Sequence, residues 1–437
     1  MSIRVIRRLQ TQGHKAYWVG GCVRDELLGR PVKDRDVATD AVPSEVRKAF
    51  PRSRSLGERF GVVIVRDHGA LTEVATFRRE SGYRDGRRPD KVIFTTDPNE
   101  DVLRRDFTVN AVLHDPIADV HIDLVEGMAD LRRGLIRTVG SPRERFGEDR
   151  LRMLRAVRLA AKLGFRIEEG TMQGIRAWAH KITSVAAERV RDELSRILTE
   201  GSPRQGFELL EQSGLLERLL PEVRAMRGVE QPPQFHPEGD VWTHTMLMLD
   251  GLREPSVPLA WGILLHDIGK PATFSKTDRI RFHGHARVGV GIARRICRRL
   301  RFSNAWSDRV LALVANHMRF LDVRRMKRST LRRFAGLPHF DEHLELHRQD
   351  CLSSGASLDG YDHASEHFRS LQDEGPGERL LTGHDLKKAG YVPGPIFGQI
   401  LSKVETLRLD GSLTTRDDAL RFVSDQYPLP VGDRSKG

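Results

Sequence analysis

The chain has 437 residues, of which 39% are hydrophobic and 30% charged, and this length suits about three domains with cores of their own. The net charge of +12 favours a polyanionic partner, nucleic acid above all, although an arginine-rich genome leaves the same mark. The three cysteines lie far apart and form no CxxC pair, which excludes a disulfide framework and a zinc ribbon. The N-terminus lacks the apolar core of a secretory signal, and no run approaches the ~20 apolar residues of a membrane span. We therefore expect a cytoplasmic protein without membrane contact.

The first third of the chain predicts a mixed α/β unit, because short apolar runs alternate with turn residues. In chain order we expect a helix over residues 3–10, a strand over 16–19 that enters a glycine turn, a helix over 23–29, a strand at 36–38, and a hairpin with strands at 62–65 and 71–77 around a turn at 67–69. From about residue 141 the pattern changes to long amphipathic helices, with breaks at 201–203, 231–240 and 375–377. The sequence thus predicts an α/β head followed by an all-α remainder.

A glycine turn opens the most informative string of the head, GGCVRDELLGRPVKDRDVATD. Gly20 and Gly21 follow the first strand, where the absence of a side chain lets the backbone come close to a triphosphate. Arg24 comes one helical step later, and its guanidinium is suited to binding phosphate. Asp34 and Asp36 then alternate at the predicted start of a strand, so that both carboxylates face the same side. Two carboxylates on one face are what two Mg²⁺ ions need for nucleotidyl transfer.

A DxD pair alone is common in surface turns, but the same pair shortly after GG and VRD is far more specific. The string resembles the polymerase-beta-type nucleotidyltransferases, and within them the class II family of bacterial CCA-adding enzymes and poly(A) polymerases. The resemblance implies that Asp34 and Asp36 hold the catalytic metal ions and that the glycine turn and Arg24 contact the nucleotide. It also implies that Glu73, on the return strand of the hairpin, is a third carboxylate of the site. The alternative is an edge-strand glutamate without a role.

The segment at 78–90 is polar, glycine-containing and rich in arginine, and it resembles the flexible loop of the same family. Tyr83, Arg84 and Arg87 either clamp the primer end or incoming nucleotide, or belong to a solvated basic loop. The loop is intact in this chain, which argues against an enzyme that adds only C and C.

The string DVLRRDFTVNA is the third part of the head that matches the family. Arg104 and Arg105 are consecutive, so on a helix their side chains diverge by roughly 100°. One can then reach a triphosphate while the other pairs with an acid such as Asp106. Family position assigns Arg105 to the nucleotide, and we expect Asn110 to bond the backbone.

Asp149, Arg152, Arg155 and Arg158 recur at intervals of three, which on a helix makes one slowly drifting stripe. Arginines alone would indicate a solvated basic face, but the acid at the head of the stripe allows another interpretation. An aspartate accepts a hydrogen bond from an exocyclic amine, and an arginine donates to the ring nitrogen or carbonyl beside it. Cytosine and adenine present this pattern, whereas uracil and guanine leave the buried groups unpaired.

The same string matches the EDxxR motif of the family, in which an aspartate and an arginine act as an amino-acid template. We therefore assign Asp149 and Arg152 to base reading. Arg155 and Arg158 are assigned to phosphate or stacking contacts with the nucleotide.

The middle of the chain carries a second constellation, marked by an adjacent His-Asp pair in GILLHDIGKP. Apolar residues before the pair indicate a buried helix, and a buried His-Asp pair is well compensated by a metal ion. The segment resembles the HD phosphohydrolases, which implies the metal ligands His244, His266, Asp267, His285, His317 and Asp350. Imidazole and carboxylate together suit Mg²⁺ or a divalent transition metal rather than a thiolate-type site. The alternative is a relic HD fold that only braces RNA.

These patterns predict four units: a polymerase-beta-type nucleotidyltransferase head (1–138), a helical neck that reads the base and binds RNA (139–228), an HD body (229–352) and a helical tail (353–437). The expected reaction is the addition of C, C and A to the 3′ end of tRNA from CTP and ATP, with Mg²⁺ in the head and release of pyrophosphate. An A-adding enzyme or poly(A) polymerase shares the head motifs and is the nearest alternative. An HD phosphohydrolase or RNA-binding protein with an inactive head is the alternative of another class.

Overall fold

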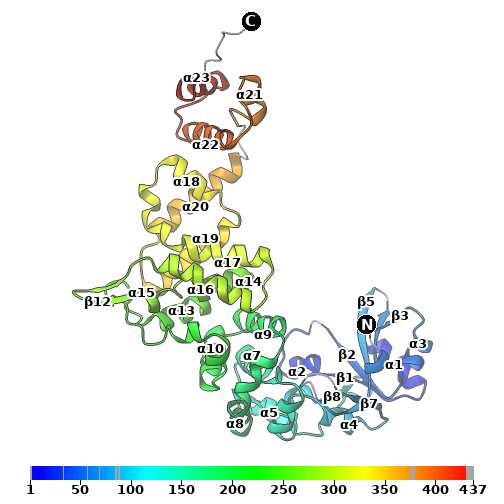
Figure 1. The fold of residues 1–437 in the computed structure, drawn as a ribbon. Coiled ribbons are helices and arrows are strands. Elements are labelled where there is room, and N and C mark those ends of the chain that lie inside the picture. The colour runs from blue at the N-terminus through cyan, green and yellow to red at the C-terminus, as the bar shows by residue number, and fades with distance from the viewer. Residues whose placement is uncertain are drawn as a thin grey trace.

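The structure is a computed structural model that describes residues 2–32, 34–56, 58–67, 69–83, 86, 89–374 and 379–429. The molecule is elongated, with the main sheet near the N-terminal end and the last helices at the other (Figure 1). Among the described residues, no helix is both long and apolar enough to cross a membrane.

The head contains a seven-stranded sheet in the order β3-β4-β5-β2-β1-β8-β9. Its strands are β1 (Ala16–Val19), β2 (Asp36–Thr39), β3 (Ser53–Ser55), β4 (Val62–Asp67), β5 (Ala70–Thr76), β8 (Leu113–Asp115) and β9 (Val120–Ile122). β2 and β5 pair in parallel, whereas the other pairs are antiparallel. The strands that carry Asp36 and Glu73 are therefore neighbours that run in the same direction.

Helices cover the sheet through their apolar faces. α1 (Ser2–Thr11) buries Val5, Ile6 and Leu9, whose spacing forms one helical face, in the same core as Val37 and Val74 of the sheet. The head also contains α2 (Gly21–Leu27), α3 (Pro43–Ala49), α4 (Pro98–Leu103), α5 (Gly127–Arg133) and a hairpin of β6 (Arg78–Ser81) with β7 (Lys91–Phe94). The predicted helices, strands and hairpin of the first third are confirmed, while His68 of the hairpin turn lies outside the described residues.

The remainder is mainly helical, as predicted. It begins with α6 (Pro142–Glu148), α7 (Arg152–Leu163), α8 (Glu169–Trp178), α9 (Ala187–Thr199), α10 (Pro203–Gln212), α11 (Leu215–Leu219) and α12 (Pro221–Arg224). It continues with α13 (Val241–Asp250), α14 (Val257–Leu265), α15 (Lys270–Thr273), a hairpin of β12 (Phe274–Lys276) and β13 (Ile280–Phe282), α16 (His285–Arg299), α17 (Asn304–Asn316), η4 (His317–Arg325), α18 (Arg328–Ala335), α19 (Phe340–Ser354) and α20 (Asp359–Glu374). The last helices are α21 (Gly383–Lys388), α22 (Pro395–Leu409) and α23 (Arg416–Gln426).

One hydrophobic core runs from Phe107 in the head through the neck helices to Leu346 on α19. It crosses the predicted boundary between neck and body, so these two parts share buried side chains. The C-terminal helices have smaller cores of their own, one around Phe334 and another around Ile400. The boundaries between the four units remain predictions.

Candidate active sites in the head and in the HD segment

The three predicted carboxylates of the head come together where β2 begins. The parallel register of β2 and β5 puts Asp36 beside Glu73. Loss of hydration, with the charges of Glu73 and Asp34, raises the pKa of Asp36 to about 6, and Arg105 acts in the opposite direction. Asp34 precedes β2, so the prediction that both aspartates lie on one strand is wrong. The cluster offers oxygen ligands alone and is open to solvent, which fits a hard cation such as Mg²⁺.

The glycine turn leads directly into α2 and its buried arginine. Gly20 has φ 82°, a conformation that favours glycine, and α2 begins at the next residue. Arg24 is buried, donates from Nη1 to Asn110 Oδ1 at 2.7 Å, and pairs with Asp25 at 2.7 Å. The Asn110 amide also donates to Asp106 Oδ1 at 3.3 Å. The expectation that Asn110 bonds the backbone is corrected, because its side chain links two charged groups instead.

Arg104 and Arg105 share one acid. α4 ends at Leu103, so neither arginine lies within the helix on which their divergence was predicted. Arg104 donates to Asp101 Oδ1 at 2.6 Å and Arg105 donates to Asp101 Oδ2 at 2.8 Å, so Asp106 is not the partner. The Nε of Arg105 is buried and has no hydrogen-bond partner in the described part of the chain. Asp101 was not predicted as their partner, although its spacing of four from Arg105 is typical of helical ion pairs.

The predicted template residues lie at the junction of α6 and α7. Asp149 caps the end of α6 in an extended conformation, so the prediction of one continuous helical stripe is wrong at its first member. Arg189 of α9 pairs with Asp149, with Nη2 at 2.8 Å from Oδ2. Arg152 begins α7 and pairs with Glu148. Both template side chains are thus already held by ion pairs, and neither Arg189 nor Glu148 was predicted.

The other two arginines of the string have different surroundings. Arg155 donates to Asp106 Oδ2 from Nε at 2.9 Å and from Nη2 at 2.6 Å. Arg158 is buried, and its Nε donates to Glu193 at 2.6 Å. The guanidinium of Arg158 is therefore engaged inside the helical neck, and we leave this residue out of the proposed nucleotide contacts.

Tyr83 lies beside the template junction. Its hydroxyl donates to Glu80 at 2.5 Å. Burial and this hydrogen bond raise the pKa of Tyr83, whereas the nearby charge of Arg152 lowers it. Arg84 and Arg87, predicted to act with it, lie outside the described residues.

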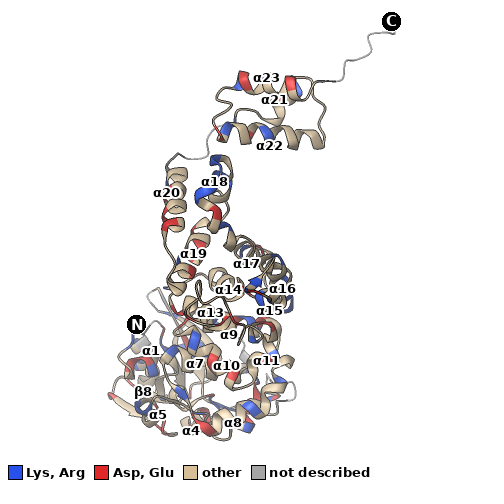
Figure 2. Cartoon of the chain, turned by 90° about the vertical axis from the view of Figure 1, so that its left-hand side faces the viewer, with Lys and Arg blue, Asp and Glu red and all other residues tan. Residues whose placement is uncertain are grey.

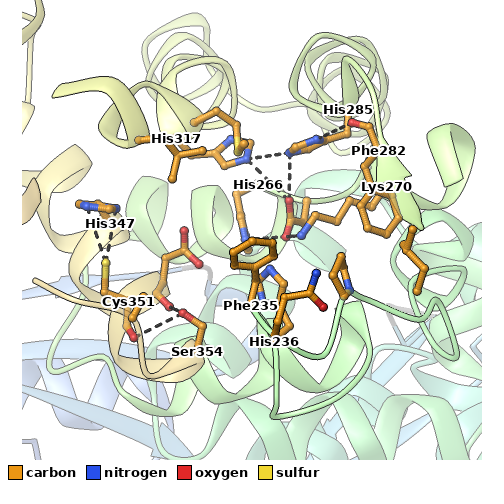
Figure 3. A pocket seen from close by; sticks show the side chains of 18 of the residues that line it. Phe235, His236, His266, Lys270, Phe282, His285, His317, His347, Cys351 and Ser354 are labelled. Carbon is orange, nitrogen blue, oxygen red and sulfur yellow. Dashed lines mark hydrogen bonds and ion pairs between the residues drawn. The ribbon is translucent and has the colours of Figure 1, made fainter. Parts of the chain in front are cut away.

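Three histidines of the HD segment point their Nε2 atoms into one cavity (Figure 3). The Nδ1 atoms of His266, His285 and His317 lie 2.7, 3.0 and 2.8 Å from the carbonyl oxygen three residues earlier. A carbonyl only accepts, so each Nδ1 carries a proton, and each ring in its neutral form presents the lone pair of Nε2. Gly269 allows the preceding turn to pack on α16, because a Cβ there would lie 2.1 Å from the His285 carbonyl oxygen.

Asp267 stands between these lone pairs. Its Oδ1 lies 3.3 Å from His285 Nε2 and 3.6 Å from His317 Nε2, and its Oδ2 lies 3.1 Å from His266 Nε2. Burial alone would raise the pKa of Asp267, but His266 and Lys270 hold it well below its ordinary value. The Nε2 atoms of His285 and His317 are only 3.1 Å apart, and two facing lone pairs need a cation or a proton between them. The arrangement fits a divalent metal ion.

A second group of ligands lies next to the first. His244 Nε2 is 3.1 Å from Asp350 Oδ1, and both residues have ligand atoms near His266. His244 Nδ1 is 2.6 Å from Glu238 Oε1. Burial would lower the pKa of His244, but Asp350 and Glu238 raise it to about 9. All six predicted HD residues are therefore brought together, while Glu238 was missed because HPEGD was interpreted only as a break.

The cavity has a volume of about 560 Å³. Asp267 and Asp350 line it together with Lys270 and the aromatic rings of Phe235 and Phe282, the last three of which are labelled in Figure 3. Lys270 lines the cavity, where its Nζ lies 2.7 Å from Asp267 and donates to Gln231 at 2.6 Å. A metal-activated water and a lysine beside an apolar wall are suited to hydrolysis of a phosphate ester.

Three family models match the chain. The model described as "Poly A polymerase head domain" matches residues 16–137. The model described as "Probable RNA and SrmB- binding site of polymerase A" matches residues 164–226, and "HD domain" matches residues 240–349.

Known proteins resemble the chain over nearly its whole length. The CCA-adding enzyme of Lactiplantibacillus plantarum is 34% identical over 428 residues, which cover 96% of this chain and 95% of that protein. The CCA-adding enzyme of Levilactobacillus brevis is 31% identical over 96% of each chain. The crystal structure of the Bacillus stearothermophilus CCA-adding enzyme in complex with CTP superposes with a TM-score of 0.75 at 27% identity, covering 97% of this chain and 96% of that chain.

Proposed function

Because the chain belongs to the family of CCA-adding enzymes, we propose that it adds C, C and A to the 3′ end of tRNA from CTP and ATP and releases pyrophosphate. The observation that carries the proposal is the cluster of Asp34, Asp36 and Glu73 beside Arg105 in a chain with full-length CCA-adding relatives. We infer that the enzyme acts in the cytoplasm, since its three cysteines are free and buried, as is common in reducing compartments.

The head supplies the groups that the transfer needs. The 3′ oxygen of the tRNA attacks the α-phosphorus of the nucleotide, the bond to the β-phosphate oxygen breaks, and pyrophosphate leaves. Members of this family use a divalent metal ion. Mg²⁺ held by Asp34, Asp36 and Glu73 would lower the pKa of the attacking hydroxyl and neutralise the leaving group. Arg105 has a buried Nε without a partner in the described chain, which supports a role in binding the triphosphate with the glycine turn. Arg24 can take the same role only by releasing Asp25 or Asn110, which hold its guanidinium.

Asp149 and Arg152 read the base in this proposal. Their ion pairs with Arg189 and Glu148 hold both side chains in defined positions before a base arrives. A carboxylate has lone pairs beyond those used in one ion pair, so Asp149 can still accept from the amine of cytosine or adenine. Arg155 lies one turn further along α7 and is our candidate for a phosphate or stacking contact, with its pair to Asp106 as the competing interaction.

Lys and Arg residues recur along the helices beyond the head, α16 and α18 among them (Figure 2). Exposed arginines include Arg294, Arg295 and Arg298 on α16, and Arg328 and Arg333 on α18. Such side chains bind phosphates without regard to sequence, which suits a substrate class as varied as the tRNAs. We therefore propose that α16 and α18 contribute to tRNA binding.

The test is to incubate the protein with a tRNA that ends at the discriminator base, supply each nucleoside triphosphate alone and in combination, and sequence the products. Addition of C, C and A that then stops supports the proposal. Addition of A alone identifies an A-adding enzyme, and a long A tail identifies a poly(A) polymerase. The full-length relatives reported above favour neither alternative.

We further propose that the HD cavity hydrolyses phosphate esters. The ligand atoms fall into two neighbouring groups, and Asp267 directs one oxygen to each group, so two divalent cations fit them. Resemblance to HD phosphohydrolases suggests 2′,3′-cyclic phosphates, 2′-nucleotides or terminal phosphates of RNA as substrates. Release of phosphate, or opening of a cyclic phosphate, with added Mg²⁺, Mn²⁺, Ni²⁺ or Co²⁺ tests this activity.

A further inference from the structure

An arginine separates the two aspartates of the head site. Arg35 lies between Asp34 and Asp36 in the chain, and a cation there is free in principle to pair with either carboxylate and compete with a metal ion. Its side chain has other partners. The Cζ atom lies 3.8 Å from the centre of the Trp18 ring, while Nη1 and Nη2 donate to the two carboxylate oxygens of Glu26 at 2.8 and 3.4 Å.

Both partners belong to elements that are packed in the head. Trp18 lies on β1, where it pairs with Val37 of β2 and is only 8% exposed. Its ring meets His114 edge to face, with centroids 5.4 Å apart. Glu26 lies on α2, the helix that begins at the glycine turn. Stacking on an aromatic face and a two-point ion pair are strong and directional for a guanidinium. Arg35 is thus held by two elements at once.

We propose that Arg35 is a positioning residue for the metal site of the head. Held by Trp18 and Glu26, it orients the backbone of residues 34–36 so that Asp34 and Asp36 share one site with Glu73, and it keeps its own charge away from them. Trp18, Glu26 and Arg35 are called the Arg35 brace below. The inference rests on the proposed function, because the brace matters only if these carboxylates bind the catalytic metal.

Positioning and simple electrostatics predict opposite results when Arg35 is removed. A positive charge next to a cation site weakens metal binding, so its loss alone should tighten binding. Loss of a residue that orients the ligands should weaken metal binding by about tenfold, as is usual for side chains that support a metal site. The direction of the change therefore decides between the two.

The experiment measures Mn²⁺ binding to the full-length protein by the electron paramagnetic resonance signal of the free ion. His266→Ala with Asp267→Ala forms the background, so that the HD ligands do not contribute. Arg35→Ala should weaken Mn²⁺ binding and raise the Mg²⁺ concentration for half-maximal CTP incorporation, with most of kcat restored at saturating Mg²⁺. Arg54→Ala removes the same charge from the exposed edge strand β3 and should bind Mn²⁺ as the background does.

Milder variants keep the test open if Arg35→Ala fails to fold. Trp18→Phe weakens the stacking, Glu26→Gln removes the ion pair and Arg35→Lys removes the planar fork, and each should weaken Mn²⁺ binding less than Arg35→Ala. Unchanged or tighter Mn²⁺ binding in Arg35→Ala overturns the proposal. If Arg35→Ala does not fold, unchanged or tighter Mn²⁺ binding in all three milder variants overturns it. Asp36→Asn separates the two levels. If Asp36→Asn still incorporates CTP, the metal assignment of the proposed function fails. If Asp36→Asn is inactive but Arg35→Ala binds Mn²⁺ as the background does, the metal assignment stands and only the Arg35 brace is overturned.

Discussion

The head and the HD segment each gather acidic or imidazole ligands, but they hold them in opposite ways. In the head, the side chains of Asp34, Asp36 and Glu73 are exposed, and partial loss of hydration together with the charges of Glu73 and Asp34 raises the pKa of Asp36. In the HD segment the ligands are mostly buried, and His266, His285 and His317 are each fixed by a backbone carbonyl. The first cluster is exposed and accessible to a large substrate, while the second lies in a preformed cavity suited to small ligands.

The difference shows how exposure and rigidity suit two kinds of chemistry. A polymerase site must admit the end of an RNA chain and a triphosphate that brings its own charge, so its carboxylates stay accessible. A hydrolytic metal site acts on a small phosphate group and gains from ligands that are oriented before the metal arrives. The two sites also lie on different elements, so each can be removed without the other.

The largest effect is expected in the head. Asp34→Ala or Asp36→Ala should reduce CTP and ATP incorporation by at least about 1,000-fold, because several kcal/mol of transition-state stabilisation by the metal is lost. tRNA binding and hydrolysis in the HD cavity should stay close to wild type. Single-turnover incorporation and filter binding measure the two properties. Normal incorporation by either variant would remove the carboxylates from the mechanism.

The reciprocal change removes the HD metal site. His266→Ala with Asp267→Ala should lower any metal-dependent phosphate ester hydrolysis by about 100-fold or more, because the activated water is lost. Nucleotide addition should be spared, since the ligands of the head lie on β2 and β5. Metal analysis of the purified protein, together with both activity assays, checks this. A wild-type protein that binds no divalent metal in this cavity would make the HD segment structural.

A smaller effect is expected at the base-reading junction. Asp149→Ala should raise incorporation of UTP and GTP relative to CTP and ATP. The free energy of discrimination should fall by roughly 1–3 kcal/mol, which is typical of one base-edge contact. The variant loses the acceptor for the exocyclic amine and the repulsion of O4 and O6, while the triphosphate contacts remain. The ratios of kcat/KM for the four nucleotides measure it, with Arg155→Ala as a comparison on α7. Unchanged selectivity would show that the template lies elsewhere.

The smallest effect concerns stability without metal. Asp36 has a folded-state pKa raised to about 6, so in the unfolded chain it loses its proton first, and the folded protein is penalised as the pH rises from about 4 to about 6. Asp36→Asn should therefore stabilise the metal-free protein at about pH 8 by about 1 kcal/mol, since exposure to solvent reduces the full effect. This difference in the free energy of unfolding should vanish below about pH 4, where the carboxyl group is largely neutral in both the folded and the unfolded state. Thermal unfolding in EDTA at several pH values checks both the sign and the pH range.

The clustering of the candidate ligands could be predicted from the sequence because short motifs carry their chemistry. The DxD pair after a glycine turn and the adjacent His-Asp pair mark the candidate ligands, and the six HD residues form two neighbouring groups of possible ligands. The partners of the charged side chains could not be predicted in the same way. Arg189 lies 40 residues from Asp149, and Glu193 lies 35 residues from Arg158. Many acids and arginines in such a charged chain offer equally plausible pairs until packing selects one.

By itself, the sequence determined the order of the units, the α/β character of the head and the residue types of both sites, because periodicity and motifs are local properties. Only the tertiary structure decided that the helix is interrupted at Asp149, between α6 and α7. It also decided that Asp101 pairs with both Arg104 and Arg105, and that Glu238 bonds to His244. It alone turned Arg35 away from the two aspartates beside it, onto Trp18 and Glu26. The physical reason is that an ion pair forms between groups that packing brings together, and distance along the chain does not record that packing.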